Sequence, residues 1–464
     1  MALPKPVERQ REVVYLAGTG HNVVLGTAGS GKTSMAILRA AYLSDPLRRE
    51  AGPTLLITFN KTLGTYIRFL AKDVLDRVTV ENFHLFARGY LNSRSLMSGK
   101  AILPRNRSTG LVSSAKQEVL SRRPGDALLA RPLKFFQDEI KWIGQHGIHS
   151  FAAYDASDRF GRGGARLLRA QRPVMWEVYE AYLALRKDAG YRYDLDDIAS
   201  AVLSAFDADT GARRYKHVII DEGQDLSPTM LQALARAVPP DGSLTLFGDV
   251  AQQIYGHRLS WRSAGLAPPK VWVFEENYRN SKAIAELALA ISNMPYYAGA
   301  ADLVAPRQPS AAGPNPTLVS FGDEESETKF VIDRATAAGQ GRSVAILTRT
   351  NEQAEQIARR LTVPVQKLEG DLMRWKGGPG VSVGTLHNGK GLEFDVVLLP
   401  YLSAVRFPHT QAIEAEGPED ATAGDGRLLY VGVTRARREL LLTYTGEATS
   451  LLPSQASLYT KVTR

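Results

Sequence analysis

A glycine-rich segment near the N-terminus has the residue types and spacing of a phosphate-binding loop. It reads G-T-A-G-S-G-K-T over residues 26–33, after an apolar, β-branched run that predicts a buried strand, and residues 35–41 favour a helix after it. In that context the backbone N–H groups of the loop point at phosphate oxygens, and the helix N-terminus adds its positive dipole end. We therefore predict a nucleotide-phosphate site formed by Gly26, Ala28, Gly29, Ser30, Gly31, Lys32 and Thr33.

Two adjacent carboxylates follow a second predicted strand. Residues 215–220 are largely apolar, and Asp221 and Glu222 come directly after them. At the carboxyl end of a parallel strand, Asp221 could hold Mg²⁺ together with the Thr33 hydroxyl, while Glu222 faces the water that attacks the γ-phosphate. Lys32 would reach the β- and γ-phosphates. Paired acids also occur at ordinary strand ends, so this interpretation depends on the glycine-rich loop upstream.

The composition bounds the class of protein. The chain has 464 residues, enough for more than one domain, and its 57 Lys and Arg against 48 Asp and Glu give a net charge of +9, which favours a polyanionic partner. It has no Cys, which excludes disulfides, thiolate zinc sites and iron–sulfur clusters. No apolar run approaches the roughly 20 residues that cross a bilayer, and the N-terminus lacks a signal-peptide core. We expect a cytoplasmic protein with no membrane association.

Five further segments, in this order, resemble the UvrD/Rep/PcrA group of superfamily-one helicases. They are D-E-G-Q-D at 221–225, L-F-G-D-V-A-Q-Q-I-Y-G at 246–256, E-N-Y-R-N-S at 276–281, V-G-T-L-H-N-G-K-G-L-E-F at 383–394 and Y-V-G-V-T-R-A at 430–436. With the glycine-rich loop, the resemblance covers most of the chain. It implies an α/β protein of two RecA-like P-loop NTPase domains, with ATP in the cleft between them.

The resemblance also assigns roles around the triphosphate. Arg279 and Arg435 match the two arginine fingers of the family, which stabilise charge that develops on the γ-phosphoryl group. Gln252 matches the γ-phosphate sensor. The alternative for either arginine is a surface salt bridge, the usual fate of an arginine side chain.

Further positions match residues that contact the nucleoside. Gln10 matches the glutamine that reads adenine, Tyr278 the ring stacked on it, and Glu393 a position that contacts the sugar. Many relatives carry an arginine near the base where this chain has Ser34, so triphosphates other than ATP could be accepted.

A track for single-stranded nucleic acid is implied as well, since such strands are held by basic grooves and stacking rings. The matching positions are Phe59, Asn60, His84, His257, Arg258, Trp261, Thr385 and His387. Phe59 would be a stacking ring, although its motif is one residue shorter than usual. His257 stands where relatives have Trp or Phe, and Trp261 could take over that role. Packing in the core or on the surface is the alternative for each of these rings.

The order of the motifs also suggests domain boundaries. We expect a first RecA-like domain over residues 1–275, with a helical insert at about 90–200, and a second over 276–464. Arginines between 159 and 172 would form either a loop that contacts nucleic acid or a solvated loop. The chain leaves no room for the accessory domain of larger relatives before residue 383, nor for a fused nuclease after residue 435.

The predicted function is that of an ATP- and Mg²⁺-dependent DNA helicase or translocase, which moves 3′ to 5′ on single-stranded DNA. The direction rests on the resemblance alone, and translocation is the safer expectation than processive unwinding. Two alternatives stay open. One is an RNA-directed motor, and the other is a nucleic-acid-sensing ATPase subunit that regulates a protein partner such as a nuclease.

Overall fold

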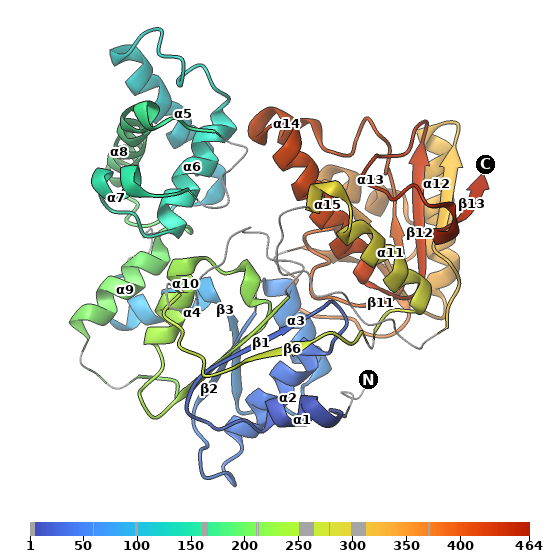
Figure 1. Ribbon diagram of the computed structural model, residues 1–464, viewed down its shortest axis with the longest axis horizontal. Helices are drawn as coiled ribbons and strands as arrows, with labels where there is room; N and C mark the ends of the chain where they lie inside the picture. The colour runs from blue at the N-terminus through green and yellow to red at the C-terminus, as the bar shows by residue number, and fades with distance from the viewer. Residues whose placement is uncertain are drawn as a thin grey trace.

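Two parallel sheets and one helical unit make up the protein (Figure 1). The computed structural model describes residues 5–58, 60–97, 101–159, 166–209, 211, 213–249, 264–277, 279–297, 312–369 and 372–464. The predicted fold class, two RecA-like domains with a helical insert in the first, is confirmed. Within those ranges no helix is both long enough and apolar enough to cross a bilayer.

The first sheet has the strand order β3-β2-β4-β5-β1-β6, and every neighbouring pair is parallel. Its strands are β1 (Gly20–Gly26), β2 (Thr54–Thr58), β3 (Val78–Asn82), β4 (His217–Ile220), β5 (Ser243–Asp249) and β6 (Val271–Phe274). The helices of this domain are α1 (Glu8–Val14), α2 (Lys32–Ser44), α3 (Lys61–Leu70), α4 (Phe83–Ser93), α9 (Ile198–Ala208) and α10 (Pro228–Arg236). Since parallel strands end at the same edge, the loop after β1 and the acids after β4 and in β5 lie together.

The helical insert leaves the first domain after α4 and returns through α9. It consists of α5 (Arg105–Arg122), α6 (Leu133–Gln145), α7 (Phe151–Ala156) and α8 (Arg172–Asp188). These helices enclose an apolar core of their own, with Phe135, Phe136 and Met175 fully buried. Figure 1 shows the insert above the first sheet, with α6 facing the second domain. The helical periodicity seen in this stretch of sequence therefore packs a separate small core.

We expected the arginines between 159 and 172 to form either a loop that contacts nucleic acid or a solvated loop. For Arg159 and Arg172 both expectations are wrong. Arg159 is buried and forms an ion pair with Glu139, and Arg172 is buried and donates to the backbone carbonyl of Tyr154. Arg166 is exposed, as a solvated loop would require. Residues 160–165 lie outside the described part of the chain. The charged run is thus partly a structural network, because burying a guanidinium requires that its donors be satisfied.

The second sheet has the order β13-β7-β12-β11-β8-β10-β9, again with every neighbouring pair parallel. Its strands are β7 (Thr317–Phe321), β8 (Ser343–Thr348), β9 (Val365–Leu368), β10 (Gly380–Thr385), β11 (Phe394–Leu399), β12 (Ala436–Thr445) and β13 (Thr460–Thr463). Its helices are α11 (Lys282–Ser292), α12 (Glu324–Gly339), α13 (Asn351–Arg360), α14 (Thr410–Glu416) and α15 (Pro418–Thr434). Between β8 and β10 the described chain contains α13 and β9 and no accessory domain.

The two RecA-like domains meet along α3 and the starts of β11 and β12. One apolar cluster contains buried residues of both, among them Leu63 and Tyr66 from α3 and Trp375 and Leu392 from the second domain. A Cβ atom on Gly391 would lie 2.8 Å from a methyl carbon of Leu63, so the domains approach closely there. This contact flanks the cleft into which the motifs of both domains point.

Candidate nucleotide cleft

The glycine-rich loop connects β1 to α2, as the sequence predicts. Gly29 and Gly31 have φ angles of +82° and +85°, a backbone conformation that glycine adopts without strain. The Lys32 ammonium is buried and donates to the backbone oxygens of Gly26 and Thr27, each at 2.8 Å. It also lies 3.4 Å from a carboxylate oxygen of Asp249, at the end of β5. The backbone of the loop therefore holds the Lys32 ammonium at the point where the chain turns after β1.

Asp221 is a buried carboxylate with unusual surroundings. It is 1% exposed, and neither of its oxygens has a hydrogen-bond partner within the described residues. Burial, followed by the charge of Glu222, raises its pKa to about 7, although the nearby Thr33 side chain opposes this shift. A desolvated carboxylate beside a hydroxyl is an oxygen donor set that suits Mg²⁺. The residues present therefore fit Mg²⁺, with Asp221 and Thr33 as its protein ligands.

Glu222 is held differently from its neighbour. Its φ angle is +56°, the left-handed region that non-glycine residues rarely adopt, and its carboxylate accepts a hydrogen bond of 2.5 Å from Gln224. Burial favours the neutral form, but the charge of Lys390, with smaller contributions from Lys32 and Arg435, outweighs it and lowers the pKa of Glu222. Glu222 is therefore the ionised member of the acidic pair.

The second domain brings arginines to the same cleft. Arg435, at the end of α15, is 2% exposed and donates to the backbone oxygens of Val431 and Leu392 at 3.0 and 3.4 Å. Burial and the neighbouring Arg279 lower its pKa to about 10. Arg279 forms an ion pair with Glu393. Both predicted arginine fingers thus lie at the cleft and are held there by second-domain groups.

Glu393 joins two guanidinium groups at the start of β11. It pairs with Arg279 and with Arg437, and their charges outweigh the effect of burial, so the pKa of Glu393 lies below its usual value. Arg437 is not among the site residues predicted from the sequence. The spacing of the motifs gave no sign of it, because Arg435 has helical backbone at the end of α15 whereas Arg437 lies in β12.

A second ion pair crosses directly between the domains. The Lys390 ammonium, from the segment between β10 and β11, lies 2.7 Å from a carboxylate oxygen of Asp225 in the first domain, and both side chains are almost fully buried. The sequence motifs contain both residues, but their spacing of 165 positions gave no sign of the contact. This pair places a second-domain cation beside Glu222.

Gln10 lies over the glycine-rich loop. Its amide nitrogen donates to the Ser30 carbonyl at 3.1 Å, and its side-chain oxygen accepts from the backbone N–H of Val7 at the same distance. A Cβ atom on Gly31 would lie 3.0 Å from the Gln10 amide nitrogen. The side chain is thus fixed at the edge of the cleft, and its role in reading adenine stays a prediction.

Four of the predicted strand-contacting residues can be placed. Asn60 caps α3, since its side chain accepts from the Leu63 N–H at 2.7 Å, and a ring nitrogen of His84 lies 3.0 Å from the Leu195 carbonyl. The Thr385 hydroxyl donates to Asn388 at 2.5 Å. The His387 side chain reaches the surface. Partial desolvation of its ring by the atoms packed around it, followed by the positive charge of Arg349, lowers its pKa. His387 alone presents an uncommitted surface; the other three serve local structure as well.

The remaining predicted site residues lie outside the described part of the chain. They are Phe59, Gln252, His257, Arg258, Trp261 and Tyr278. Their assignments stay predictions.

Comparisons with known proteins bear on the whole arrangement. Residues 7–265 match the family described as UvrD/REP helicase N-terminal domain, and residues 365–447 match the UvrD-like helicase C-terminal domain. The ATP-dependent DNA helicase UvrD2 of Mycobacterium tuberculosis is 25% identical over an alignment that covers 94% of this chain and 78% of that protein. UvrD1 of the same organism is 26% identical over 78% of this chain and 49% of its own length.

The first of these matches alone spans more than half of the chain, and the two matches together include β1 to β5 of the first sheet and β9 to β12 of the second. The chain belongs to the UvrD/REP helicase family and is one of its ATP-hydrolysing enzymes.

Proposed function

We propose that the protein couples Mg²⁺-dependent ATP hydrolysis to 3′-to-5′ movement along single-stranded DNA. The observation that carries the proposal is the composition of the cleft. Glu222 of the first domain is kept ionised, against its burial, by Lys390 and Arg435 of the second domain together with Lys32. The charge state of the catalytic carboxylate therefore depends on the position of the other domain, as a motor with a closing cleft requires.

The roles of the side chains follow from their surroundings. Mg²⁺ held by Asp221 and Thr33 would neutralise phosphate charge. Glu222 is ionised and can accept a proton from the attacking water, whereas Asp221 next to it favours the neutral form until a cation is bound. Arg435 and Arg279 would stabilise charge on the γ-phosphoryl group from the second domain. The two arginine roles and the ionised state of Glu222 need both domains in contact, whereas Asp221 and Thr33 both belong to the first domain.

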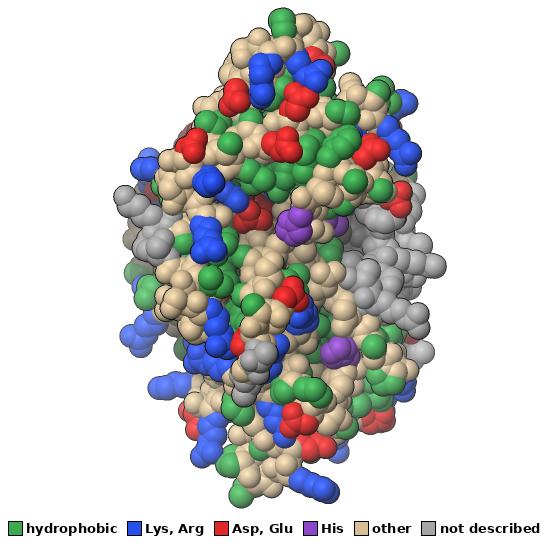
Figure 2. Space-filling model, turned by 90° about the vertical axis from the view of Figure 1, so that its left-hand side faces the viewer, with side chains coloured by type: hydrophobic (Ala, Val, Ile, Leu, Met, Phe, Trp, Pro, Cys, Tyr) green, Lys and Arg blue, Asp and Glu red, His purple; other side chains and the backbone are tan. Residues whose placement is uncertain are grey.

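Several observations support DNA as the track. The chain carries a net charge of +9, and Lys and Arg side chains lie over both the insert and the first domain on the face in Figure 2. The exposed His387 stands where the charges of Arg349, Lys390 and Lys141 of the insert all act on it. The relatives compared above carry the name ATP-dependent DNA helicase. Cationic side chains at the surface suit a phosphate backbone.

The first test is steady-state ATP hydrolysis with and without a single-stranded DNA oligomer, with Lys32→Ala as the control. We expect strong stimulation by the strand and none in the variant, together with a loss of stimulation as salt rises, because phosphate contacts release counterions. Hydrolysis that is indifferent to strands would contradict the proposal. Stimulation by oligo-U but not by oligo-dT would replace DNA with RNA.

Direction needs a separate measurement. We expect the protein to displace streptavidin from a biotin at the 5′ end of a single strand and to leave it on the 3′ end. The opposite preference would overturn the proposed polarity while leaving the motor itself intact.

A further inference from the structure

One face of α3 is covered by a segment of the second domain. Thr62, Thr65, Tyr66 and Phe69 recur at spacings of three, one and three, which places them on a single helical stripe. Facing them is the segment between β9 and β10, which we call the strap; its described residues are Glu369 and 372–379.

Hydrogen bonds fix the strap to that stripe. The Thr62 hydroxyl donates to the backbone oxygen of Glu369 at 2.8 Å, and the Thr65 hydroxyl donates to that of Leu372 at 2.9 Å. Both bonds use main-chain acceptors of the strap. These two hydrogen bonds thus depend on the path of the strap backbone, and their side-chain donors are the two threonines of α3.

Aromatic packing completes the contact. The rings of Tyr66 and Trp375 meet edge to face with centroids 4.9 Å apart, and Trp375 also packs on Phe394, 6.2 Å away. Phe394 directly follows Glu393, which holds Arg279 and Arg437 at the nucleotide cleft. A Cβ atom on Gly377 would collide with the ring of Phe69, so the strap backbone passes directly against that ring. The path from the cleft to α3 is therefore a chain of packed rings two contacts long.

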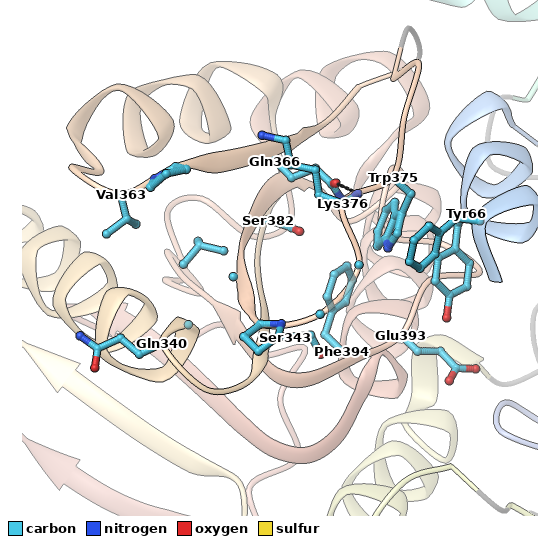
Figure 3. A pocket seen from close by; sticks show the side chains of 18 of the residues that line it. Tyr66, Gln340, Ser343, Val363, Gln366, Trp375, Lys376, Ser382, Glu393 and Phe394 are labelled. Atoms are coloured by element: carbon cyan, nitrogen blue, oxygen red, sulfur yellow. Dashed lines mark hydrogen bonds between the residues drawn. The ribbon is translucent and has the colours of Figure 1, made fainter. Parts of the chain in front are cut away.

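A cavity of about 510 Å³ lies behind this contact (Figure 3). Tyr66, Trp375 and Phe394 line it together with Gln366 and Ser382, and Gln366 accepts a 2.7 Å hydrogen bond from the backbone N–H of Lys376. Close-packed interiors transmit displacement but resist local movement, whereas a void beside a ring gives that ring room to move. The strap can therefore shift against α3 without repacking the second sheet.

The other end of α3 leads to the segment assigned to the nucleic-acid track. Asn60 caps the helix and Lys61 is its first residue, and Asn60 is two positions after Thr58, the last residue of β2. A helix of this length is a rigid element, so a push on Tyr66 or Phe69 displaces its N-terminus as well.

We infer that Trp375 is a positioning residue, which transmits closure of the nucleotide cleft to the strand-contacting end of α3 through Tyr66. The inference rests on the proposed strand-stimulated hydrolysis. It assigns a function to a segment that belongs to none of the helicase motifs. The proposed role is mechanical, exerted through the ring contacts of Trp375 with Tyr66 and Phe394.

Kinetics of strap variants test this inference. Trp375→Ala should lower the strand-stimulated kcat about tenfold, a usual size for coupling between two sites, and leave the unstimulated rate and the KM for ATP within about twofold. Trp375→Phe, which keeps a ring against Tyr66, should restore most of the stimulation. Thr65→Val should lose part of it. Trp176→Ala in the insert is the matched control, since Trp176 and Trp375 are both 8% exposed.

The possible outcomes separate the two hypotheses. If wild type is not stimulated by any strand, the proposed function fails and the inference fails with it. If wild type is stimulated and Trp375→Ala is stimulated equally, only the inference is overturned. Equal loss of stimulated and unstimulated rates in Trp375→Ala would also overturn it, because that pattern indicates a merely structural role.

A fluorescent reporter gives a readout independent of turnover. The chain has no Cys, and Met373 in the strap is 93% exposed, so Met373→Cys can carry the only thiol-linked dye. A non-hydrolysable ATP analogue with Mg²⁺ should change the emission of the dye, and a DNA oligomer should change the analogue's effect. Both responses should be lost in the Thr65→Val, Trp375→Ala background. Thr65→Val alone, which removes only the hydrogen bond to Leu372, should weaken both responses and serves if Trp375→Ala misfolds. If the emission of the dye on folded Met373→Cys protein, with no other substitution, did not change when the nucleotide analogue is added, the inference would be overturned.

Discussion

Glu139 in the insert and Asp221 in the cleft are both carboxylates with almost no exposed surface, yet their surroundings are opposite. Glu139 accepts from the Tyr154 hydroxyl at 2.7 Å and from two guanidinium nitrogens of Arg159 at 2.6 and 2.5 Å. Neither oxygen of Asp221 has a partner within hydrogen-bonding distance among the described residues. Thr33 and Lys32 lie nearby, and the neighbour in sequence is another acid. The first carboxylate is satisfied by the fold; the second is left for a ligand.

This difference distinguishes burial that supports structure from burial that supports chemistry. A buried ion pair with complete hydrogen bonding fixes the position of each group, and removing one partner leaves the other as an uncompensated buried charge. A buried acid without partners destabilises the fold and persists because a cation completes it. The two kinds of site should therefore respond oppositely when their charge is removed.

The largest expected effect is on turnover when Asp221 loses its charge. Asp221→Asn should reduce ATP hydrolysis about a thousandfold, since a bound metal contributes several kcal/mol to such transition states. Its melting temperature should stay the same or rise, because a desolvated charge beside Glu222 is gone. Steady-state kinetics and calorimetry on the same preparation measure both. A clear drop in melting temperature would remove the contrast with Glu139.

Glu139→Ala should show the reverse pattern. We expect the insert to lose about 3–5 kcal/mol of stability, the usual result of leaving one member of a buried pair uncompensated. Hydrolysis per folded molecule in the absence of nucleic acid should persist, because the cleft does not contain Glu139. Urea denaturation and active-site titration check these points, and Arg159→Met combined with Glu139→Leu should recover much of the stability. Loss of unstimulated hydrolysis in a folded variant would be contrary to this expectation.

Removing Mg²⁺ should have a smaller effect, confined to the cleft. In the presence of saturating ADP, chelation should lower the melting temperature of wild type by about 2–4 °C, because a ligand that binds only the native state stabilises it. Asp221→Asn should show no such shift, whereas Glu139→Gln should shift as wild type does. A shift of equal size in Asp221→Asn would place the metal elsewhere.

The smallest expected effect concerns Asp225, which is intermediate between the two carboxylates. It is paired with Lys390, yet burial outweighs that pair and raises its pKa from 3.8 to about 6. A raised carboxyl pKa means that the stabilising contribution is present at low pH and is lost as pH rises through 6. Relative to Asp225→Asn, wild type should therefore lose stability between about pH 4 and 6. Denaturation midpoints at several pH values measure this, and parallel curves for the two proteins would contradict it.

The sequence predicted the fold class well because the relevant signals are local. Apolar runs that end in the glycine-rich loop or in Asp221 mark the ends of parallel strands, and helical periodicity marks the insert. The catalytic roles stay predictions, although Lys32, Thr33, Asp221 and Glu222 lie at one sheet edge. This clustering follows from the order of the strands in the sheet, which cannot be inferred from the spacing of the motifs along the chain.

Pairings between the domains could not be predicted. The contacts of Lys390 with Asp225 and of Trp375 with Tyr66 each join distant segments whose alignment depends on how the two sheets pack. The contact of Arg437 with Glu393 lies within the second domain and depends on the pairing of β11 with β12. Asn60 illustrates a different limit. Its side chain caps α3, a local role that the resemblance to helicases does not indicate.

The left-handed backbone of Glu222 has a consequence for the selection of more thermostable variants of this protein. A glutamate in that conformation costs about 1 kcal/mol. Glycine avoids this cost because it has no Cβ atom, and asparagine reduces it because its short side chain can form local hydrogen bonds. A variant library that is screened only for thermostability should therefore become enriched in Glu222→Gly or Glu222→Asn. These variants would be more stable but would not hydrolyse ATP. Heat resistance and catalysis must be selected together at this position, because the local geometry sets them against each other.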